Sequence, residues 1–337
     1  MTAMPDQSLP RVQLIATGGT IASRPDPRTG AVGPAVDPAE LIAAVPAAAA
    51  YATVTGEPFA AVASWNMTPA MMFALARRLD EVLADPQTGG AVVTHGTDTV
   101  EETSLLVDLV LQSDKPVCFA VAQRHSAAPG ADGPANLTAA VRVAASPAAK
   151  GRGAMVIAND EIHPAVSVVK THTTNPATFA SPGHGPAGVV TPTGVHFSSP
   201  ATAREPLVVE RIEERVVLAK LVTGMDDRLL RWLVDDGVAG LVIEGSGAGN
   251  VPGTTVSGIV HALDRGVPVV LTSRCQAGAL SPTYGTPGGG RTLRNLGVIA
   301  GGELTGPKAR IALMVLLGLT RDREPIRRYF EGNRYTQ

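Results

Sequence analysis

Short apolar stretches recur along the chain, and several of them end in small polar residues. The first, 12–16, runs into Thr17, Gly18, Gly19 and Thr20, and a second, beginning at Ala91, runs into 94–98. Apolar, β-branched stretches that end at glycines are typical of buried parallel strands followed by a turn. We therefore predict strands at these two places, and further strands at 116–121 and 154–158.

Helical spacing appears between these strands. In the segment 99–110, Leu105, Leu106 and Leu109 fall on one face of a helix, and Thr99 with Glu102 has the spacing of a capping box. A second helix is predicted around 135–145. Strands that alternate with helices indicate an α/β fold with a mostly parallel sheet.

The composition changes at 200–215, which is richer in charge and proline and is interpreted as a linker. Strands at 216–221, 241–243 and 267–272 follow, and an amphipathic helix is predicted at 307–319. We expect two α/β domains with mostly parallel sheets, a larger N-terminal domain at 1–199 and a smaller C-terminal domain at 216–337 that closes the site.

Composition narrows the class of protein. The chain has 337 residues, of which 45% are hydrophobic and 17% charged, with a net charge of -2, so it can bury a large core and has no basic footprint for nucleic acid. The apolar segment 311–319 is shorter than the ~20 residues of a membrane span. The first residues lack the pattern of a secretory signal, and the two cysteines, Cys118 and Cys275, exclude a disulfide framework. We expect a cytoplasmic protein with no membrane association.

Threonine and aspartate side chains follow two of the predicted strands. In open parallel sheets, ligands bind at the carboxyl ends of strands, and Thr20, Thr97 and Asp98 lie there. The adjacent Gly19 and Gly96 let a small ligand approach backbone N–H groups. The alternative is that these residues only form turns.

Lys170 follows a third apolar stretch, 166–169. A partly buried lysine needs an anionic partner, and Asp98 is the candidate. Because a threonine hydroxyl is a weak nucleophile, a lysine beside it can act as its base. The alternative is a surface lysine whose stem lies along apolar residues.

Other chemistries fit less well. The segment 245–250 fails the dinucleotide pattern because its third glycine is missing, which weakens the interpretation as an oxidoreductase. The seven histidines include no H-x-x-x-H pair, so no metal site is expected. Cys275, at a strand end, is a weaker candidate nucleophile.

The residues resemble a known family at this point. The segments 16–22 (ATGGTIA) and 94–103 (THGTDTVEET) look like the two signatures of the bacterial L-asparaginase/glutaminase family. The similarity continues through 131–137 (ADGPANL), 169–174 (VKTHTT) and 307–310 (PKAR), and it covers nearly the whole chain.

The resemblance implies an amidohydrolase that releases ammonia from a small amide without a cofactor. It makes Thr20 the covalent nucleophile and Thr97, Asp98 and Lys170 its activating group. The substrate-binding positions that it implies are Ser64, Trp65, Gly19, Gly96 and Asn250. The family forms homo-oligomers, dimers or tetramers, in which the asparagine that maps to Asn250 comes from a neighbouring subunit.

Three departures from the family pattern stand out. The lid after the first signature, 23–32, contains no tyrosine, and Tyr284 is either its substitute or an ordinary packed residue. Trp65 replaces the family's substrate-binding glutamine, and an indole cannot accept a hydrogen bond from an ammonium group. The segment 281–291 offers no clear acidic residue for the substrate amine.

We therefore expect an asparaginase-like hydrolase that acts through a threonine acyl-enzyme, with L-asparagine as the first candidate substrate. The alternatives are an amidase of the same fold that acts on a different amide, and a non-catalytic protein that binds an amino acid or amide.

Overall fold

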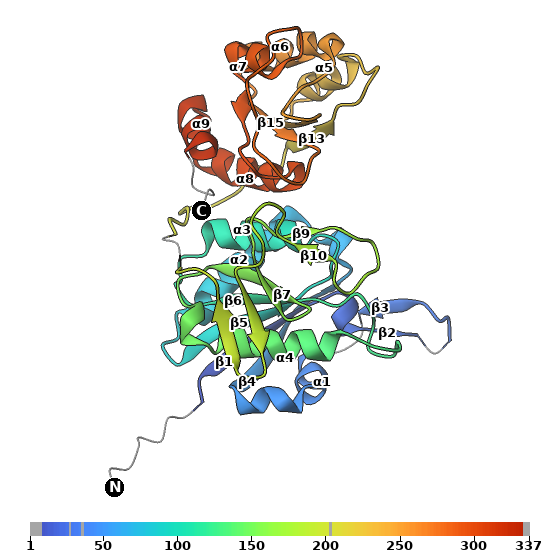
Figure 1. The fold of residues 1–337 in the computed structure, drawn as a ribbon, viewed down its shortest axis with the longest axis vertical. Helices are drawn as coiled ribbons and strands as arrows, with labels where there is room; N and C mark the ends of the chain where they lie inside the picture. The colour runs from blue at the N-terminus through green and yellow to red at the C-terminus, as the bar shows by residue number, and fades with distance from the viewer. Residues whose placement is uncertain (1–8, 27, 35–36, 202–203, 333–337) are drawn as a thin grey trace. The chain divides into compact units, whose positions relative to one another are not determined.

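The computed structural model describes residues 9–26, 28–34, 37–201 and 204–332 (Figure 1). The chain divides into two compact units, 1–206 and 207–337, a division that lies inside the segment 200–215. Each unit has a largely parallel sheet with helices packed on it, so the predicted fold class is confirmed. The terminal residues of the two domain ranges, 1–8 and 333–337, lie outside the described residues.

The first unit is built on an eight-stranded sheet with the order β12-β11-β8-β7-β6-β5-β1-β4. Its strands are β1 (Arg11–Gly18), β4 (Thr53–Val62), β5 (Thr88–Thr94), β6 (Val117–Ala120), β7 (Ala154–Ala158), β8 (Glu161–Pro164), β11 (Gly188–Thr191) and β12 (Gly194–Phe197). The strands from β4 to β7 are parallel, and β8, β11 and β12 extend the sheet antiparallel. The parallel arrangement brings the carboxyl ends of β1, β5 and β6 to one edge.

Two short hairpins accompany this sheet. The pair β2 (Ser23–Pro25) and β3 (Val32–Pro34) forms within and beyond the predicted lid, of which Pro27 lies outside the described residues. The pair β9 (Val169–Lys170) and β10 (Phe179–Ala180) holds Lys170 opposite Phe179.

The four predicted strands of this unit are present, whereas β4 was not predicted from the pattern. Gly56 and Pro58 interrupt its sequence, and most of its residues are partly or fully exposed. Proline lacks the N–H that a central strand requires, so this composition suits an edge strand. β4 occupies the edge beside β1.

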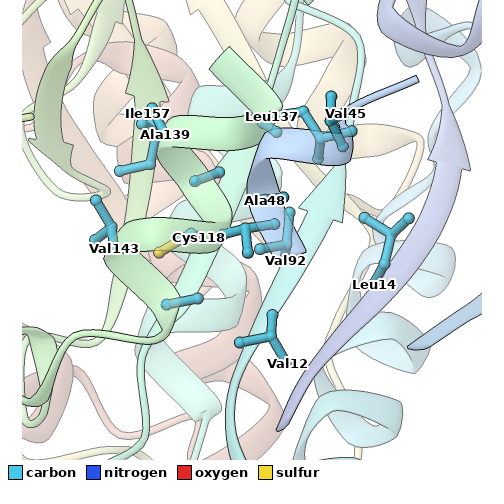
Figure 2. Packing of buried hydrophobic residues seen from close by; sticks show 14 of the residues in the cluster. Val12, Leu14, Val45, Ala48, Val92, Cys118, Leu137, Ala139, Val143 and Ile157 are labelled. Carbon is cyan, nitrogen blue, oxygen red and sulfur yellow. The ribbon is translucent and has the colours of Figure 1, made fainter. Parts of the chain in front are cut away.

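Helices cover both faces of the sheet. These are α1 (Pro38–Ala43), α2 (Pro69–Leu83), α3 (Val100–Val110) and α4 (Gly133–Ala144). α2 and α3 lie on one face, and α1 and α4 lie on the other (Figure 1). In Figure 2, Leu137 and Val143 of α4 pack among Val92, Cys118 and Ile157 of the strands. This buried cluster packs α4 against the sheet whose strands β1 and β5 end in the two threonine turns.

The predicted start of α3 just after Asp98 is confirmed, but the predicted capping box is not formed. Thr99 is the N-cap residue, but its hydroxyl makes no capping hydrogen bond and instead donates to the backbone oxygen of Ser64 at 2.7 Å. The tertiary contact therefore replaces the local one, and it ties the turn after β5 to the segment after β4.

The second unit has a four-stranded parallel sheet with the order β13-β14-β15-β16. Its elements are β13 (Val216–Lys220), β14 (Gly240–Gly245), β15 (Val269–Ser273), β16 (Ile299–Ala300), α5 (Arg228–Asp235), α6 (Val256–Asp264), α7 (Gly290–Leu296), α8 (Gly306–Leu319) and α9 (Arg323–Glu331).

The helix predicted at 307–319 is present as α8, but the expectation that it is amphipathic is wrong. Most of its residues are buried, including Lys308. One side contacts the sheet, and on another side the Glu213 N–H donates to the Met314 oxygen at 2.9 Å. The residues before β13 therefore cover a face of α8 that was expected from the sequence to be exposed to solvent.

Candidate active site

The turn that carries Thr20 is formed by two glycines at the end of β1. Gly18 and Gly19 have φ values of 104° and 78°, which residues with a side chain rarely adopt. A Cβ atom on Gly19 would clash with the backbone nitrogen of Gly96. Thr20 follows in a 3₁₀ turn, Thr20–Ala22, whose Ile21 and Ala22 are buried. The two signature turns are therefore in backbone contact, and Thr20 is fixed beside the second turn.

The second turn joins β5 to α3 and carries Thr97 and Asp98. Thr97 is buried, with 5% of its surface exposed. A Cβ atom on Gly96 would lie 2.6 Å from the Ser64 hydroxyl, so a larger residue does not fit between this turn and Ser64. Both threonine turns thus lie at the carboxyl edge of adjacent parallel strands, as the strand-end rule predicts.

Ser64 and Trp65 lie in a 3₁₀ turn, Ser64–Asn66, that follows β4. Ser64 is buried against Gly96, whereas Trp65 is 69% exposed. Neighbouring residues of one turn therefore offer different surfaces: a hydroxyl inside the cluster and an open indole outside it.

Lys170 joins the second turn through two contacts. Its Nζ lies 2.8 Å from Thr97 Oγ1 and 2.5 Å from Asp98 Oδ1. The lysine side chain is 13% exposed and the aspartate side chain 47%. A mostly buried ammonium needs such an anionic partner. The structure therefore brings together Thr97, Asp98 and Lys170, and it pairs Lys170 with Asp98 as the sequence analysis expected.

Gln123 is a polar residue of this cluster that the sequence analysis missed. It follows the end of β6, the strand beside β5, and its Oε1 accepts a hydrogen bond from Thr97 Oγ1 at 3.1 Å. The strand-end rule was the available signal, because Gln123 follows two residues after the strand predicted at 116–121.

His95 orients the backbone of the second turn. Its Nδ1 lies 2.8 Å from the Gly96 carbonyl oxygen, which only accepts, so Nδ1 carries the proton. Burial lowers the pKa of His95 to about 4, so the ring is neutral at pH 7. Because the carbonyl and N–H of a trans peptide point in opposite directions, this bond also fixes the Thr97 N–H.

The buried neutral His95 predicts a loss of stability in acid. Its ordinary pKa is 6.5 and its folded pKa about 4, so the unfolded chain gains a proton first as the pH falls. His95 therefore lowers the free energy of unfolding by about 3 kcal/mol as the pH falls from about 6.5 to 4. Above pH ~6.5 the ring is neutral in both states and has no such effect. Urea unfolding at pH 7, 5.5 and 4 measures this loss.

The matched variants for this prediction are His95→Asn and His196→Asn. The first removes the buried ring, and its stability should fall less with acid than that of the wild type. The second removes an exposed histidine on β12 and should leave the pH dependence unchanged. Equal pH dependences for all three proteins contradict the prediction.

Asn250 and Tyr284 belong to the second unit. Asn250 follows β14, and its Oδ1 accepts a hydrogen bond from the Gly290 N–H at 3.2 Å. Tyr284 lies in the loop between β15 and α7 and is 57% exposed. The beginning of α7 therefore holds the Asn250 side chain, whereas the Tyr284 ring is open to solvent.

Within the described residues, no group of three or more His, Cys, Asp or Glu side chains is arranged to hold a metal ion. The helices in the described part of the chain are also too short or too polar to cross a membrane.

Comparison with known proteins agrees with this architecture. The "Asparaginase, N-terminal" family model matches residues 11–203, and the "Glutaminase/Asparaginase C-terminal domain" model matches residues 215–330. L-asparaginase 2 of Bacillus subtilis (strain 168) is 34% identical, over 98% of this chain and 88% of that protein. A subunit of the glutamyl-tRNA(Gln) amidotransferase of Methanothermobacter thermautotrophicus is 36% identical, over 98% of this chain and 77% of that protein.

A solved structure extends the comparison to three dimensions. The probable cytoplasmic L-asparaginase from Campylobacter jejuni superposes with a TM-score of 0.87 at 34% identity, covering 96% of this chain and 99% of that one. The fold and the two domain matches define an amidohydrolase. The chain belongs to the asparaginase family, as its two signature segments predicted.

Proposed function

We propose that the chain hydrolyses L-asparagine to the acid and ammonia through an acyl-enzyme on Thr20. One observation carries the proposal. The Thr20 turn contacts the Thr97 turn, and Lys170 donates hydrogen bonds to both Thr97 and Asp98. A weak hydroxyl nucleophile needs such a proton-transfer group beside it.

In the proposed first step, Thr20 Oγ bonds to the amide carbon and its proton passes to the amine of Lys170, which hydrogen bonds to Thr97 and Asp98 hold in place. Backbone N–H groups near Thr20 and Thr97 hold the oxyanion. The C–N bond then breaks, and the departing nitrogen takes a proton and leaves as ammonia. Water attacks the ester carbon in the second step, which releases the acid and restores the Thr20 hydroxyl.

Binding roles go to the residues around the two turns. Gly19 and Gly96, which let the turns pack closely, bind the substrate through their backbone, Ser64 contributes a hydroxyl, and the exposed Trp65 forms a wall. We propose that a second copy of the chain supplies Asn250 and that the working form is a dimer or tetramer. Light scattering on the purified protein measures this assembly, and a monomer with full activity contradicts it.

The function is tested by measuring ammonia release from L-asparagine, L-glutamine, D-asparagine and succinamate. Hydroxylamine is added in a parallel series, because an acyl-enzyme transfers its acyl group to this nucleophile and yields a hydroxamate. We expect turnover of L-asparagine and formation of its hydroxamate. Absence of ammonia from all four amides would overturn the proposal and favour a binding protein.

An amide other than free asparagine is a second candidate because of Trp65. Its exposed indole has a donor and no acceptor, so it cannot accept a hydrogen bond from a substrate ammonium group. Some relatives are named as amidotransferase subunits, which is consistent with a different amide donor.

Trp65→Gln is expected to increase the preference for a substrate with an amine. Glutamine supplies the missing acceptor, so the kcat/KM ratio of L-asparagine to succinamate, which lacks the amine, should rise about tenfold. The measurement is steady-state kinetics on both amides. Trp232→Gln, a change at a 63% exposed tryptophan on α5, is the matched control and should leave the ratio unchanged. A ratio that Trp65→Gln also leaves unchanged excludes Trp65 from amine recognition.

A further inference from the structure

The segment 131–137 resembles the family's sequence but contributes no residue to the proposed reaction. Its Asp132 carboxylate accepts the N–H groups of Gln123 at 3.0 Å and Arg124 at 2.9 Å. Asn136 donates to the Val121 oxygen at 2.9 Å and accepts from the Asn159 N–H at 2.9 Å. The beginning of α4 therefore holds the backbone of 121–124 at the carboxyl end of β6.

The same part of α4 also contacts the Thr20 turn. A Cβ atom on Gly133 would lie 3.1 Å from Ile21 Cγ1, so the beginning of the helix packs directly on the turn that carries Thr20. One rigid element thus supports both the nucleophile's turn and the loop that carries Gln123.

The orientation of the Gln123 amide follows from its partners. Nε2 lies 3.4 Å from the Thr173 oxygen and 3.3 Å from the Asn175 oxygen. Carbonyl oxygens only accept, so the amide NH₂ must face them, and Oε1 must face Thr97. Thr97 Oγ1 is therefore the donor in its 3.1 Å bond to Gln123.

This orientation fixes the direction of the Thr97 O–H bond. A hydroxyl has one proton, and it is donated in the hydrogen bond to Gln123 Oε1, so Thr97 presents a lone pair to Lys170 Nζ at 2.8 Å. Without Gln123, the hydroxyl can rotate, and its proton can point at the lysine or toward the Thr20 turn. The acceptor geometry that a proton-transfer group requires is then held for only part of the time.

We propose that Gln123 is a positioning residue that fixes the direction of the Thr97 proton and links Thr97 to the loop after Lys170. This inference rests on the proposed function, because it assigns Gln123 a role through Thr97 rather than through the substrate. Loss of the contact should therefore lower kcat and leave KM nearly unchanged.

Hydrogen bonds within the loop after Lys170 hold the carbonyl groups that Gln123 contacts. The Thr171 N–H donates to the Thr178 oxygen at 2.8 Å, and the N–H groups of Thr174 and Asn175 both lie 3.0 Å from His172 Nδ1. Gln123 therefore bonds to two carbonyls of a loop that its own hydrogen bonds already order.

Charged and titratable groups surround the contact, and they bear on any test that uses pH. They are Lys170 and Asp98 at Thr97, Asp132 and Arg124 beside the Gln123 backbone, and His172 in the anchoring loop. Dividing the kcat of each variant by that of the wild type at the same pH cancels the effect that these groups have on both proteins.

The test compares Gln123→Met, Gln123→Glu and Gln112→Met with the wild type, using ammonia release from the best amide between pH 5 and 8. Gln123→Met keeps the length of the side chain and removes both hydrogen-bonding ends. Gln112→Met makes the same change after the far end of α3, where Gln112 Nε2 donates to the Val110 oxygen at 2.6 Å, and it serves as the matched control. Thermal unfolding of each variant reports on folding.

Gln123→Met is expected to lower kcat about tenfold or more, with KM within about threefold of the wild type. Gln123→Glu has a readout that a purely structural role does not predict. When protonated, its carboxyl accepts from Thr97 and donates to a backbone oxygen as the amide does. When ionised, it faces two carbonyl oxygens and repels them. Its kcat relative to the wild type should therefore rise as the pH falls, while the ratio for Gln123→Met stays flat.

The outcomes separate this inference from the proposed function. If both Gln123 variants keep wild-type kcat while Thr97→Ala is inactive, the role of Gln123 is wrong and the function stands. If Thr97→Ala itself keeps full activity, the proposed function fails. If Gln123→Met does not fold, the pH-dependent ratio of Gln123→Glu decides, and a flat ratio overturns the role of Gln123.

Discussion

Replacing Thr20 by alanine is expected to lower kcat by about 10³-fold or more, because the atom that forms the acyl-enzyme is removed. The fold should persist: Thr20 is partly exposed, and the glycines that set its turn are unchanged. The measurement is ammonia release and hydroxamate formation from the best amide. Thr20→Ser restores a hydroxyl and should recover part of the activity.

Thr55→Ala is the matched control for this prediction. Thr55 is exposed on β4, where its hydroxyl donates to Gln13 Oε1 at 2.7 Å, and its loss should leave kcat unchanged. If Thr20→Ala keeps more than about one tenth of the wild-type kcat, Thr20 is not the nucleophile, since loss of a covalent nucleophile has a far larger effect.

The Thr20 variant also tests the proposed contribution of Asn250 by a second copy. Thr20→Ala and Asn250→Ala protomers, each impaired alone, should recover activity when mixed and allowed to exchange. With random pairing, about one quarter of the sites combine an intact Thr20 with an intact Asn250 from the other copy. No recovery despite proven exchange of protomers contradicts the shared site.

Lys170→Met carries the second largest expected effect. The change removes the amino group whose nitrogen lies 2.8 Å from Thr97 Oγ1 and 2.5 Å from Asp98 Oδ1, and it keeps most of the apolar stem. Acid–base catalysis by a positioned side chain contributes about 10²- to 10⁴-fold, so kcat should fall by about 10³-fold. Steady-state kinetics should show a much smaller change in KM.

The control is Lys150→Met, which breaks a lysine–aspartate pair of similar length at the surface. Lys150 Nζ lies 3.1 Å from Asp114 Oδ2, and both side chains are mostly exposed. Exposed pairs contribute about 0–1 kcal/mol, so this variant should keep wild-type kcat and nearly wild-type stability. A Lys170→Met enzyme with the same kcat as Lys150→Met would remove Lys170 from the proton-transfer group.

The elements that the sequence predicted well are those that a pattern of neighbouring residues is enough to indicate. The strands at β1, β5, β6 and β7 are continuous apolar stretches, and burial on both faces of a parallel sheet requires such stretches. The signature segments also indicated the family through their resemblance to it. The structure shows that their glycines lie in turns with no room for a side chain.

Features that were missed or wrongly predicted depend on neighbours far along the chain. β4 carries Gly56 and Pro58 and is a strand because β1 offers it an edge. α8 is buried on most sides because residues 211–213 cover it, which no helical period records. Thr99 has the local spacing of a cap and is used instead to hold Ser64.

The amino-acid sequence by itself determined the family, the α/β class and the residue types of the site, since these follow from strand patterns and from short motifs with little conformational choice. The pairing of Lys170 with Asp98 was expected from the sequence, whereas only the tertiary structure showed that Gln123 joins Thr97. Thr97, Lys170 and Gln123 come from segments that the sheet brings to one edge, and the direction of a hydroxyl proton is set by partners that lie far apart in the chain.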